Sequence, residues 1–160
     1  MHTILSYQGD AVLAHTAPAP GLTEDVTCVV WGSDLTQEDR PRLARRALRA
    51  SAAEALTVVR AHASLKHLVL IYRGSPQHRR RLRSSAQSVA RRLHAELERT
   101  RARYVDVVVI DITDLDDHPM IEQRLSKLAG TTAGIVGYAA IRWEDLHEES
   151  IHDTCTRDVV

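Results

Sequence analysis

The chain has 160 residues, of which 44% are hydrophobic, and 21 Lys and Arg balance 21 Asp and Glu to a formal net charge of zero. This length fits one domain with a substantial core and excludes two independent domains. No window approaches the roughly 18 apolar residues of a membrane span, and the first residues lack a secretory signal, so we expect a cytoplasmic protein with no membrane partner.

The first predicted element is a β-hairpin. Residues 3–7 and 11–16 have strand-like patterns on either side of Gly9, which can supply the positive φ of a tight turn. Pro18 and Pro20 then end the pairing, because proline donates no backbone hydrogen bond. Residues 26–31 follow as a buried strand, so three strands precede the first predicted helix.

Two long helices and two core strands are predicted in the middle of the chain. Asp39 as N-cap, with a proline in the first turn, opens the first helix, whose apolar stripe consists mostly of alanine. Residues 68–72 are a compact apolar run with β-branched members, which predicts a central strand. Ser75 and the proline after it start the second helix, and residues 105–112 form another core strand.

A shorter helix and a last strand complete the prediction. Asp117 opens this helix, Gly130 ends it, and residues 134–143 form the strand. Residues 144–160 are expected to be an acidic, polar C-terminal tail. The order strand, strand, strand, helix, strand, helix, strand, helix, strand predicts a single α/β domain over residues 1–160. Its mixed sheet of about six strands is expected to be antiparallel at the start and parallel where helices connect the strands.

Opposite charges are segregated along the chain. Residues 1–39 hold six acidic residues and no Lys or Arg, residues 40–103 hold seventeen basic and three acidic residues, and residues 104–160 hold four basic and twelve acidic residues. The three net charges are therefore −6, +14 and −8. This separation predicts a basic face that meets phosphates, or one that meets an acidic face on another copy. Pairing of the basic middle with the acidic end inside one molecule is a further alternative.

Arginines crowd the start of the second long helix. Positive charge at a helix N-terminus opposes the helix dipole, which costs a few tenths to about 1 kcal/mol unless an anion compensates. The predicted nucleic-acid-binding residues are Arg79, Arg80, Arg81, Arg83, Arg91 and Arg92, and the first helix adds Arg40, Arg42, Arg45, Arg46 and Arg49. Aromatic residues do not interleave with these arginines, which favours contact with the phosphate backbone over base stacking. A solvated, arginine-rich face without a ligand is the alternative.

A second candidate site is acidic. Asp111, Asp114 and Asp117 follow a core strand at its carboxyl end, where open α/β sheets bind their ligands. Carboxylates so spaced can hold Mg²⁺ or act as acid and base, and they serve equally well as turn formers and as a helix N-cap. These three residues are the catalytic candidates, and whether the protein is an enzyme stays open.

Other motifs do not support a site. Residues 130–137 look like a phosphate loop, but they connect a helix to a strand and carry no lysine. His147 and His152 miss the spacing of an HExxH metal motif. Cys28 and Cys155 fit neither a zinc site nor a disulfide framework, in agreement with a reducing compartment. The sequence predicts no metal and identifies no cofactor.

The predicted order of elements resembles that of RNase H-like folds. Residues 68–74, the helix after them, residues 105–109 and the Gly130-Thr131 pair are similar to the PIWI-type member of that class. Such domains usually carry an Asp where this chain has Arg73, so the resemblance implies nucleic-acid binding rather than metal-dependent cleavage. The hairpin-first order also resembles small trimeric enamine deaminases, whose C-terminal arginine motif has no counterpart here.

Three functions follow as hypotheses. The leading one is a non-catalytic binding domain whose basic helical surface contacts nucleic-acid phosphates. The second is a small α/β enzyme with an acidic site at the strand ends. The third is a self-assembling or protein-interaction domain driven by charge segregation.

Overall fold

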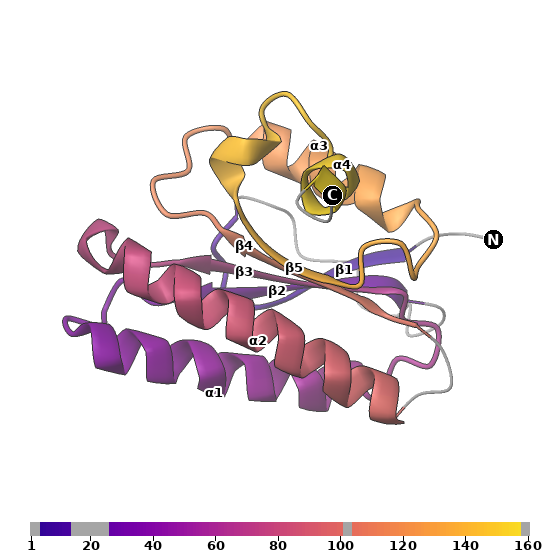
Figure 1. The fold of residues 1–160 in the computed structure, drawn as a ribbon, viewed down its shortest axis with the longest axis horizontal. Coiled ribbons are helices and arrows are strands. Elements are labelled where there is room, and N and C mark those ends of the chain that lie inside the picture. The colour runs from indigo at the N-terminus through magenta and orange to yellow at the C-terminus, as the bar shows by residue number, and fades with distance from the viewer. Residues whose placement is uncertain (1–3, 14–25, 101–103, 158–160) are drawn as a thin grey trace.

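Five parallel strands form the centre of the protein in the computed structural model (Figure 1). They are β1 (Ile4–Gly9), β2 (Val26–Asp34), β3 (His67–Arg73), β4 (Asp106–Asp111) and β5 (Tyr138–Arg142), and they lie side by side in this order. All four neighbouring pairs are parallel. The structure describes residues 4–13, 26–100 and 104–157. The carboxyl ends of all five strands therefore meet at one edge of the sheet.

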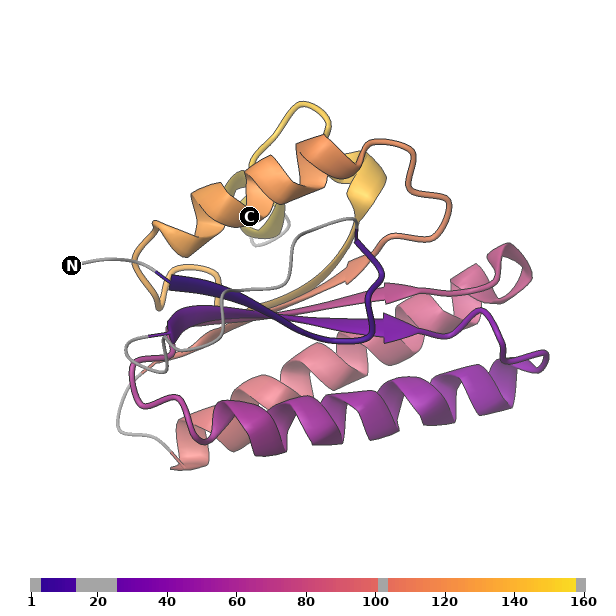
Figure 2. The same cartoon turned by 180° about the vertical axis from the view of Figure 1, so that it is seen from behind.

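Helices cover both faces of this sheet (Figures 1 and 2). The helices α1 (Pro41–Val59) and α2 (Arg79–Thr100) lie on one face, and α3 (His118–Ala129) and α4 (Ile151–Arg157) lie on the other. Short 3₁₀ turns, η1 (Pro76–His78) and η2 (Trp143–Leu146), precede α2 and α4. Strands buried on both faces need apolar side chains in both directions, which explains the unbroken apolar runs of β3 and β4.

Each face of the sheet has its own hydrophobic core. Leu68 and Leu70 of β3 pack with Leu48 of α1 and the leucines of α2. Val69 and Ile71, which alternate with them, pack with the apolar face of α3. Successive side chains of a strand point to opposite faces, so β3 alone contributes to both layers. The protein is a single α/β domain built in three layers.

The hand of the connections differs between the two faces. The helices α1 and α2 join neighbouring strands on one face, and α3 makes the next step in the same direction, from β4 to β5, on the other face. Two such connections on opposite faces have opposite hands. Since parallel strands are joined almost always by right-handed connections, one of the two kinds is the rare left-handed one.

The expected mixed sheet of about six strands is wrong. β1 pairs parallel with β2 instead of forming a hairpin, and Ile4 aligns with Val26. Val12 and Leu13 belong to the core beneath α3 rather than to a second strand, while residues 14–16 of that expected strand lie outside the described residues. Within the described residues the antiparallel opening shared with RNase H-like folds and enamine deaminases is absent.

Gly9 shows why the hairpin prediction failed. Its φ of 76° is the positive value that a tight turn requires. After this residue, however, the Asp10 N–H donates to the Gly32 carbonyl at 2.9 Å, so the chain continues beside the end of β2. A glycine with positive φ is compatible both with a hairpin turn and with a chain that continues beside β2. Burial of Val12 and Leu13, which is a tertiary property, decides between them.

The helix boundaries follow the sequence signals in part. Asp117 caps α3 and Gly130 lies at its C-cap, as predicted. Arg40 rather than Asp39 is the N-cap of α1, and Ser75 precedes η1 rather than α2 itself. The last strand covers only Tyr138–Arg142 of the predicted residues 134–143.

In its described part, the segment predicted as a polar C-terminal tail, residues 144–160, contains the part of η2 after Trp143 and all of α4. Leu146, Ile151 and Cys155 are buried there in the core beneath α3. None of the helices in the described residues combines the length and the hydropathy that a membrane span requires.

Candidate functional site

Ten arginines on the outer surface of α1 and α2 make no ion pair within the described residues. All are exposed except Arg45, which is partly buried. We call these residues the arginine layer: Arg40, Arg42, Arg45, Arg46, Arg49, Arg80, Arg81, Arg83, Arg91 and Arg92. Glu96 lines a hollow with Arg49 and Arg92 but lies within ion-pair distance of neither, so the ten guanidinium groups keep a large excess of positive charge, which attracts anions.

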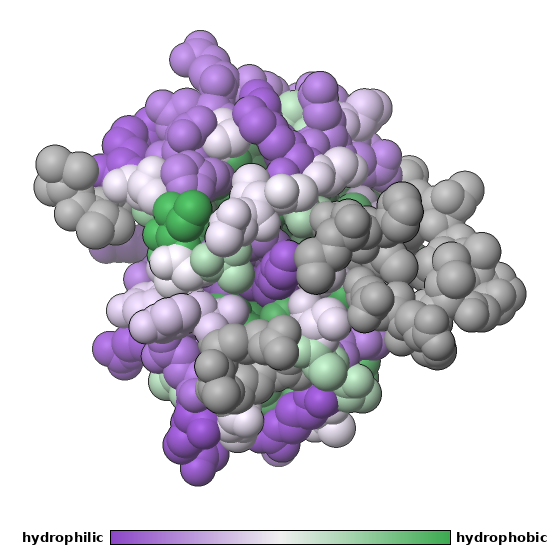
Figure 3. Space-filling model, turned by 90° about the vertical axis from the view of Figure 1, so that its right-hand side faces the viewer, coloured by the Kyte–Doolittle hydropathy of each residue, from purple (hydrophilic) through white to green (hydrophobic). Residues whose placement is uncertain are grey.

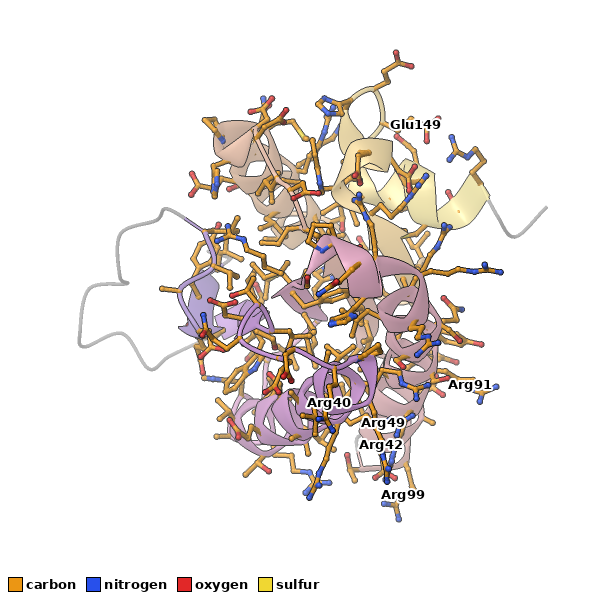
Figure 4. All side chains as sticks on the ribbon, turned by 90° about the vertical axis from the view of Figure 1, so that its left-hand side faces the viewer. Arg40, Arg42, Arg49, Arg91, Arg99 and Glu149 are labelled. Carbon is orange, nitrogen blue, oxygen red and sulfur yellow. The ribbon has the colours of Figure 1, made fainter. Side chains whose placement is uncertain are left out.

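The two helices contribute to a continuous basic surface. Five arginines of α1 and its N-cap line one hollow together with Leu43. Arg45 of α1 lines a second hollow, of about 420 Å³, with Arg80 and Arg81 of α2. In Figure 4, Arg40, Arg42, Arg49 and Arg91 project outward from α1 and α2. The second hollow therefore joins the basic groups of both helices.

The helix starts add to the positive potential of this surface. A short loop joins β2 to α1, and η1 joins β3 to α2, so the first turns of both helices lie at the carboxyl edge of the sheet. Neither helix has an acidic residue in its first turn, and no side chain caps the start of α1. Positive side chains therefore stand at the positive end of the helix dipoles, where an anion would be stabilising.

The acidic part of the chain lies on the other side of the sheet (Figures 1 and 2). Asp114, Asp116, Glu148 and Asp153 are exposed in or beside α3 and α4. Of the arginines in residues 40–100, Arg79 is the only one that forms an ion pair with residues 104–157. The expected alternative, internal pairing of the basic middle with the acidic end, is therefore limited to this residue within the described chain.

Arg79 lies apart from the arginine layer, at the carboxyl edge of the sheet. Its Nε lies 3.4 Å from Oδ2 of Asp111, which is 2% exposed, and its Nη2 pairs with Glu144. Burial by itself lowers the pKa of Arg79, but the hydrogen bond and the charge of Glu144, together with Asp111, outweigh burial and raise it. Of the six predicted nucleic-acid-binding arginines, this one is thus already partnered.

The same edge contains a hydrogen-bond network around Thr113. Asp111 Oδ1 accepts from the Thr113 N–H at 2.8 Å, and the Thr113 hydroxyl accepts from the Gly74 N–H at 3.0 Å. The Trp143 indole donates to the Thr113 carbonyl at 2.9 Å. The network ties the ends of β3, β4 and β5 together, so Arg79 and Asp111 reinforce the junction of three strands.

The three catalytic candidates have separate places. Asp111 accepts from Thr113 and pairs with Arg79, as described above. Asp114 is exposed in the loop after β4 with a φ of 61°, and Asp117 Oδ1 accepts from the Met120 N–H at 3.0 Å as the N-cap of α3. The described residues hold no group of three or more side chains that could bind a metal ion. The enzyme hypothesis stays a prediction.

Replacing Asp117 with alanine is expected to lower the free energy of unfolding by about 1 kcal/mol, because the Met120 N–H loses its capping acceptor. Urea denaturation followed by circular dichroism measures this change. Asp116→Ala is the matched control, since Asp116 is exposed one residue earlier. Equal midpoints for both variants would contradict the assigned cap.

Sequence reasoning missed a buried polar cluster at the opposite, amino edge of the sheet. His67 and Asp106 are both 1% exposed, and His67 Nδ1 lies 3.7 Å from Asp106 Oδ2. Asp106 Oδ1 accepts from the N–H groups of Gly134 and Gly137 at 3.1 and 2.9 Å. The glycine-rich loop that resembles a phosphate loop is therefore bound to its own chain. The signal available in the sequence was a lone Asp inside an apolar strand.

Figure 3 looks onto this amino edge. Neutral and hydrophobic residues lie there between the hydrophilic surfaces of the two helical layers. Ile135 and Tyr104 are among the exposed large hydrophobic residues of the protein, 54% and 67% exposed. In the described part of this view, the surface is thus hydrophilic over the helical layers and less polar between them.

No family model, no curated protein and no solved structure matches the chain.

Proposed function

We propose that the arginine layer binds nucleic-acid phosphates, as a non-catalytic binding surface. The observation that carries the proposal is the hollow where Arg45 of α1 meets Arg80 and Arg81 of α2. No carboxylate lines this hollow, and none pairs with the three arginines within the described residues. Guanidinium groups from two helices around one hollow can contact one phosphate from several sides.

The residue types favour phosphate over a carboxylate ligand. The layer consists of arginine, whose planar fork donates two parallel hydrogen bonds to a phosphate and remains charged at every physiological pH. Its length along α1 and α2 suits several phosphates in a row rather than one small anion. A single aromatic side chain, Tyr138, lines a hollow with Arg80, Arg83 and Arg91, and none alternates with the arginines along α1 and α2, so we expect mainly contact with the backbone and little sequence preference.

Fluorescence anisotropy with labelled duplex DNA, single-stranded DNA and RNA tests the proposal. Between about 50 and about 200 mM salt, the logarithm of the binding constant for duplex DNA is expected to fall with a slope of about −4 or steeper, because each neutralised phosphate contributes about −0.9. A difference in affinity among the three probes identifies the preferred nucleic acid. Absence of binding to all three at the lowest salt would overturn the proposal.

A second candidate function is self-assembly, favoured by the placement of opposite charges on opposite faces. The arginine layer covers one side of the sheet, and the exposed acids of the α3 and α4 side cover the other. Two different faces that attract each other produce a head-to-tail contact, which continues from copy to copy unless a ring closes.

Light scattering across a salt series tests this second candidate. The mean particle mass is expected to exceed that of the monomer at low salt and to fall toward it as salt is added, because exposed charges are screened. A constant monomer mass at low salt would contradict self-assembly and would leave nucleic-acid binding untouched.

A further inference from the structure

The outer edge of β5 lies open between α2 and α4 (Figure 1). β5 pairs only with β4, and no other described strand covers it. The Val107 N–H donates to the Gly137 carbonyl at 2.9 Å. In a parallel ladder the backbone groups of Ala139 and Ile141 then also face β4, and those of Tyr138, Ala140 and Arg142 face outward.

Two of these outward residues have no backbone partner on that side. The Arg142 N–H donates to Asp145 Oδ2 at 3.4 Å, which ends the free edge. Within the described residues, no hydrogen bond occupies the outward N–H and carbonyl groups of Tyr138 and Ala140. Both residues also line surface hollows, so an incoming chain can reach them. An unpaired strand edge of this kind is a template for an added strand.

One flank of this edge is basic. Arg80, Arg83 and Arg91 of α2 line a hollow of about 600 Å³ together with Tyr138 and Ala140. The remaining lining residues, two serines and a glutamine, are neutral, and the hollow contains no carboxylate. Side chains of an added strand that point to this face would meet three guanidinium groups.

The other flank is mainly apolar. A second hollow, of about 410 Å³, continues across the edge and is lined by Val136, Ala139, Ile141 and Cys155. Gln87 and His94 of α2 and Gly137, Tyr138 and Ala140 at the strand edge also line it. Side chains of an added strand that point to this face would meet aliphatic carbon. The two flanks therefore require different side chains at alternate positions.

We propose that β5 binds an extended peptide segment in which acidic and apolar side chains alternate, and that this segment adds to the sheet as a sixth strand. The outward backbone groups of Tyr138 and Ala140 supply the main-chain hydrogen bonds, and the alternating flanks supply the preference for side chains. This inference does not depend on nucleic-acid binding by the arginine layer.

Charge disfavours antiparallel pairing with the β5 edge of a second copy. Antiparallel pairing of two β5 edges places both α2 helices on the same face of the joined sheet. Arg80, Arg83 and Arg91 of each copy would then face those of the other without a carboxylate between them. Like charges juxtaposed in this way are strongly unfavourable. An acidic segment turns the same arginines into attractive contacts.

A fluorescein-labelled hexapeptide of alternating glutamate and valine, blocked at both ends, is the probe. Two modified versions carry backbone N-methyl groups, one on all glutamates and the other on all valines. In an added strand only one set of N–H groups faces β5, so one modified probe is expected to bind at least about tenfold more weakly and the other to retain its affinity. Equal affinity of the two modified probes would show attraction by charge alone and would overturn the proposal, as would absence of binding by the unmodified peptide.

Variants of the protein test the basic flank. Arg91→Glu is expected to weaken binding of the unmodified peptide by about tenfold, because an attraction at the edge becomes a repulsion. Arg99→Glu on the same helix is the matched control, since Arg99 lines neither hollow. It is expected to change the affinity by less than about twofold. Equal losses in both variants would also contradict the site. The N-methyl comparison needs no nucleic acid, so a failure here is distinct from a failure of the arginine layer.

Discussion

Replacement of Asp106 with alanine is expected to lower the free energy of unfolding by about 2–3 kcal/mol. The Asp106 side chain accepts from the N–H groups of Gly134 and Gly137 and lies beside His67, which is equally buried. Alanine would remove the acceptor of two loop N–H groups, of which Gly137 is partly buried and Gly134 exposed, and would remove the carboxylate that lies nearest to the buried His67 ring. Because buried polar groups without partners are costly, the effect should far exceed that of a surface substitution.

Urea denaturation followed by circular dichroism measures the Asp106 effect. Asp106→Asn keeps one side-chain oxygen and is expected to have an intermediate loss. Asp116→Ala, at an exposed position on the same segment of chain, should stay within about 0.5 kcal/mol of the wild type. A loss below about 1 kcal/mol for Asp106→Ala would show that the loop and His67 find other partners.

Reversal of two charges in the arginine layer is expected to weaken duplex-DNA binding about a hundredfold at low salt. Arg45→Glu and Arg81→Glu are combined, because these residues approach the shared hollow from different helices. Each change removes an attraction to phosphate and adds a repulsion. The difference from the wild type should shrink as salt rises, and anisotropy titrations at several salt concentrations measure it.

The control for this pair is a double variant with the same change in net charge. Arg60 and Arg99 are exposed at the far ends of α1 and α2, and neither lines the shared hollow. Arg60→Glu combined with Arg99→Glu should weaken binding by less than about tenfold. Equal losses in both double variants would mean that net charge rather than the shared hollow controls binding. Thermal melts of both variants establish that the fold is intact.

Local patterns were enough to predict much of the secondary structure. The N-cap at Asp117 and the C-cap at Gly130 depend on interactions within one turn of helix, and both predictions are confirmed. The apolar runs of β3 and β4 required burial on both faces, and both strands are buried. The candidate basic residues were visible as well, because charged side chains without partners are rarely buried and therefore lie on the solvent-facing side of a helix.

Other features depend on contacts between distant parts of the chain. The partner of β1 could not be read from residues 3–16, because a positive φ at Gly9 fits both a hairpin and a chain that runs on beside Gly32. The partners of Arg79 are Asp111, at the carboxyl end of β4, and Glu144 of η2. The difference between Arg79 and the other arginines could therefore be seen only once these ends were brought together in the fold. The open edge of β5 could likewise not be predicted, because a strand can be identified as an edge strand only when the order of the strands in the sheet is known.

The sequence by itself determined that this protein is an α/β domain with two long basic helices and an acidic end, because hydrophobic periodicity and charge are properties of short segments. It left open whether the basic and acidic regions neutralise each other. The tertiary structure decided that question for the described residues. Because α3 connects β4 to β5 across the face opposite α1 and α2, the sheet stands between the two regions, and the arginine layer remains free to meet a ligand.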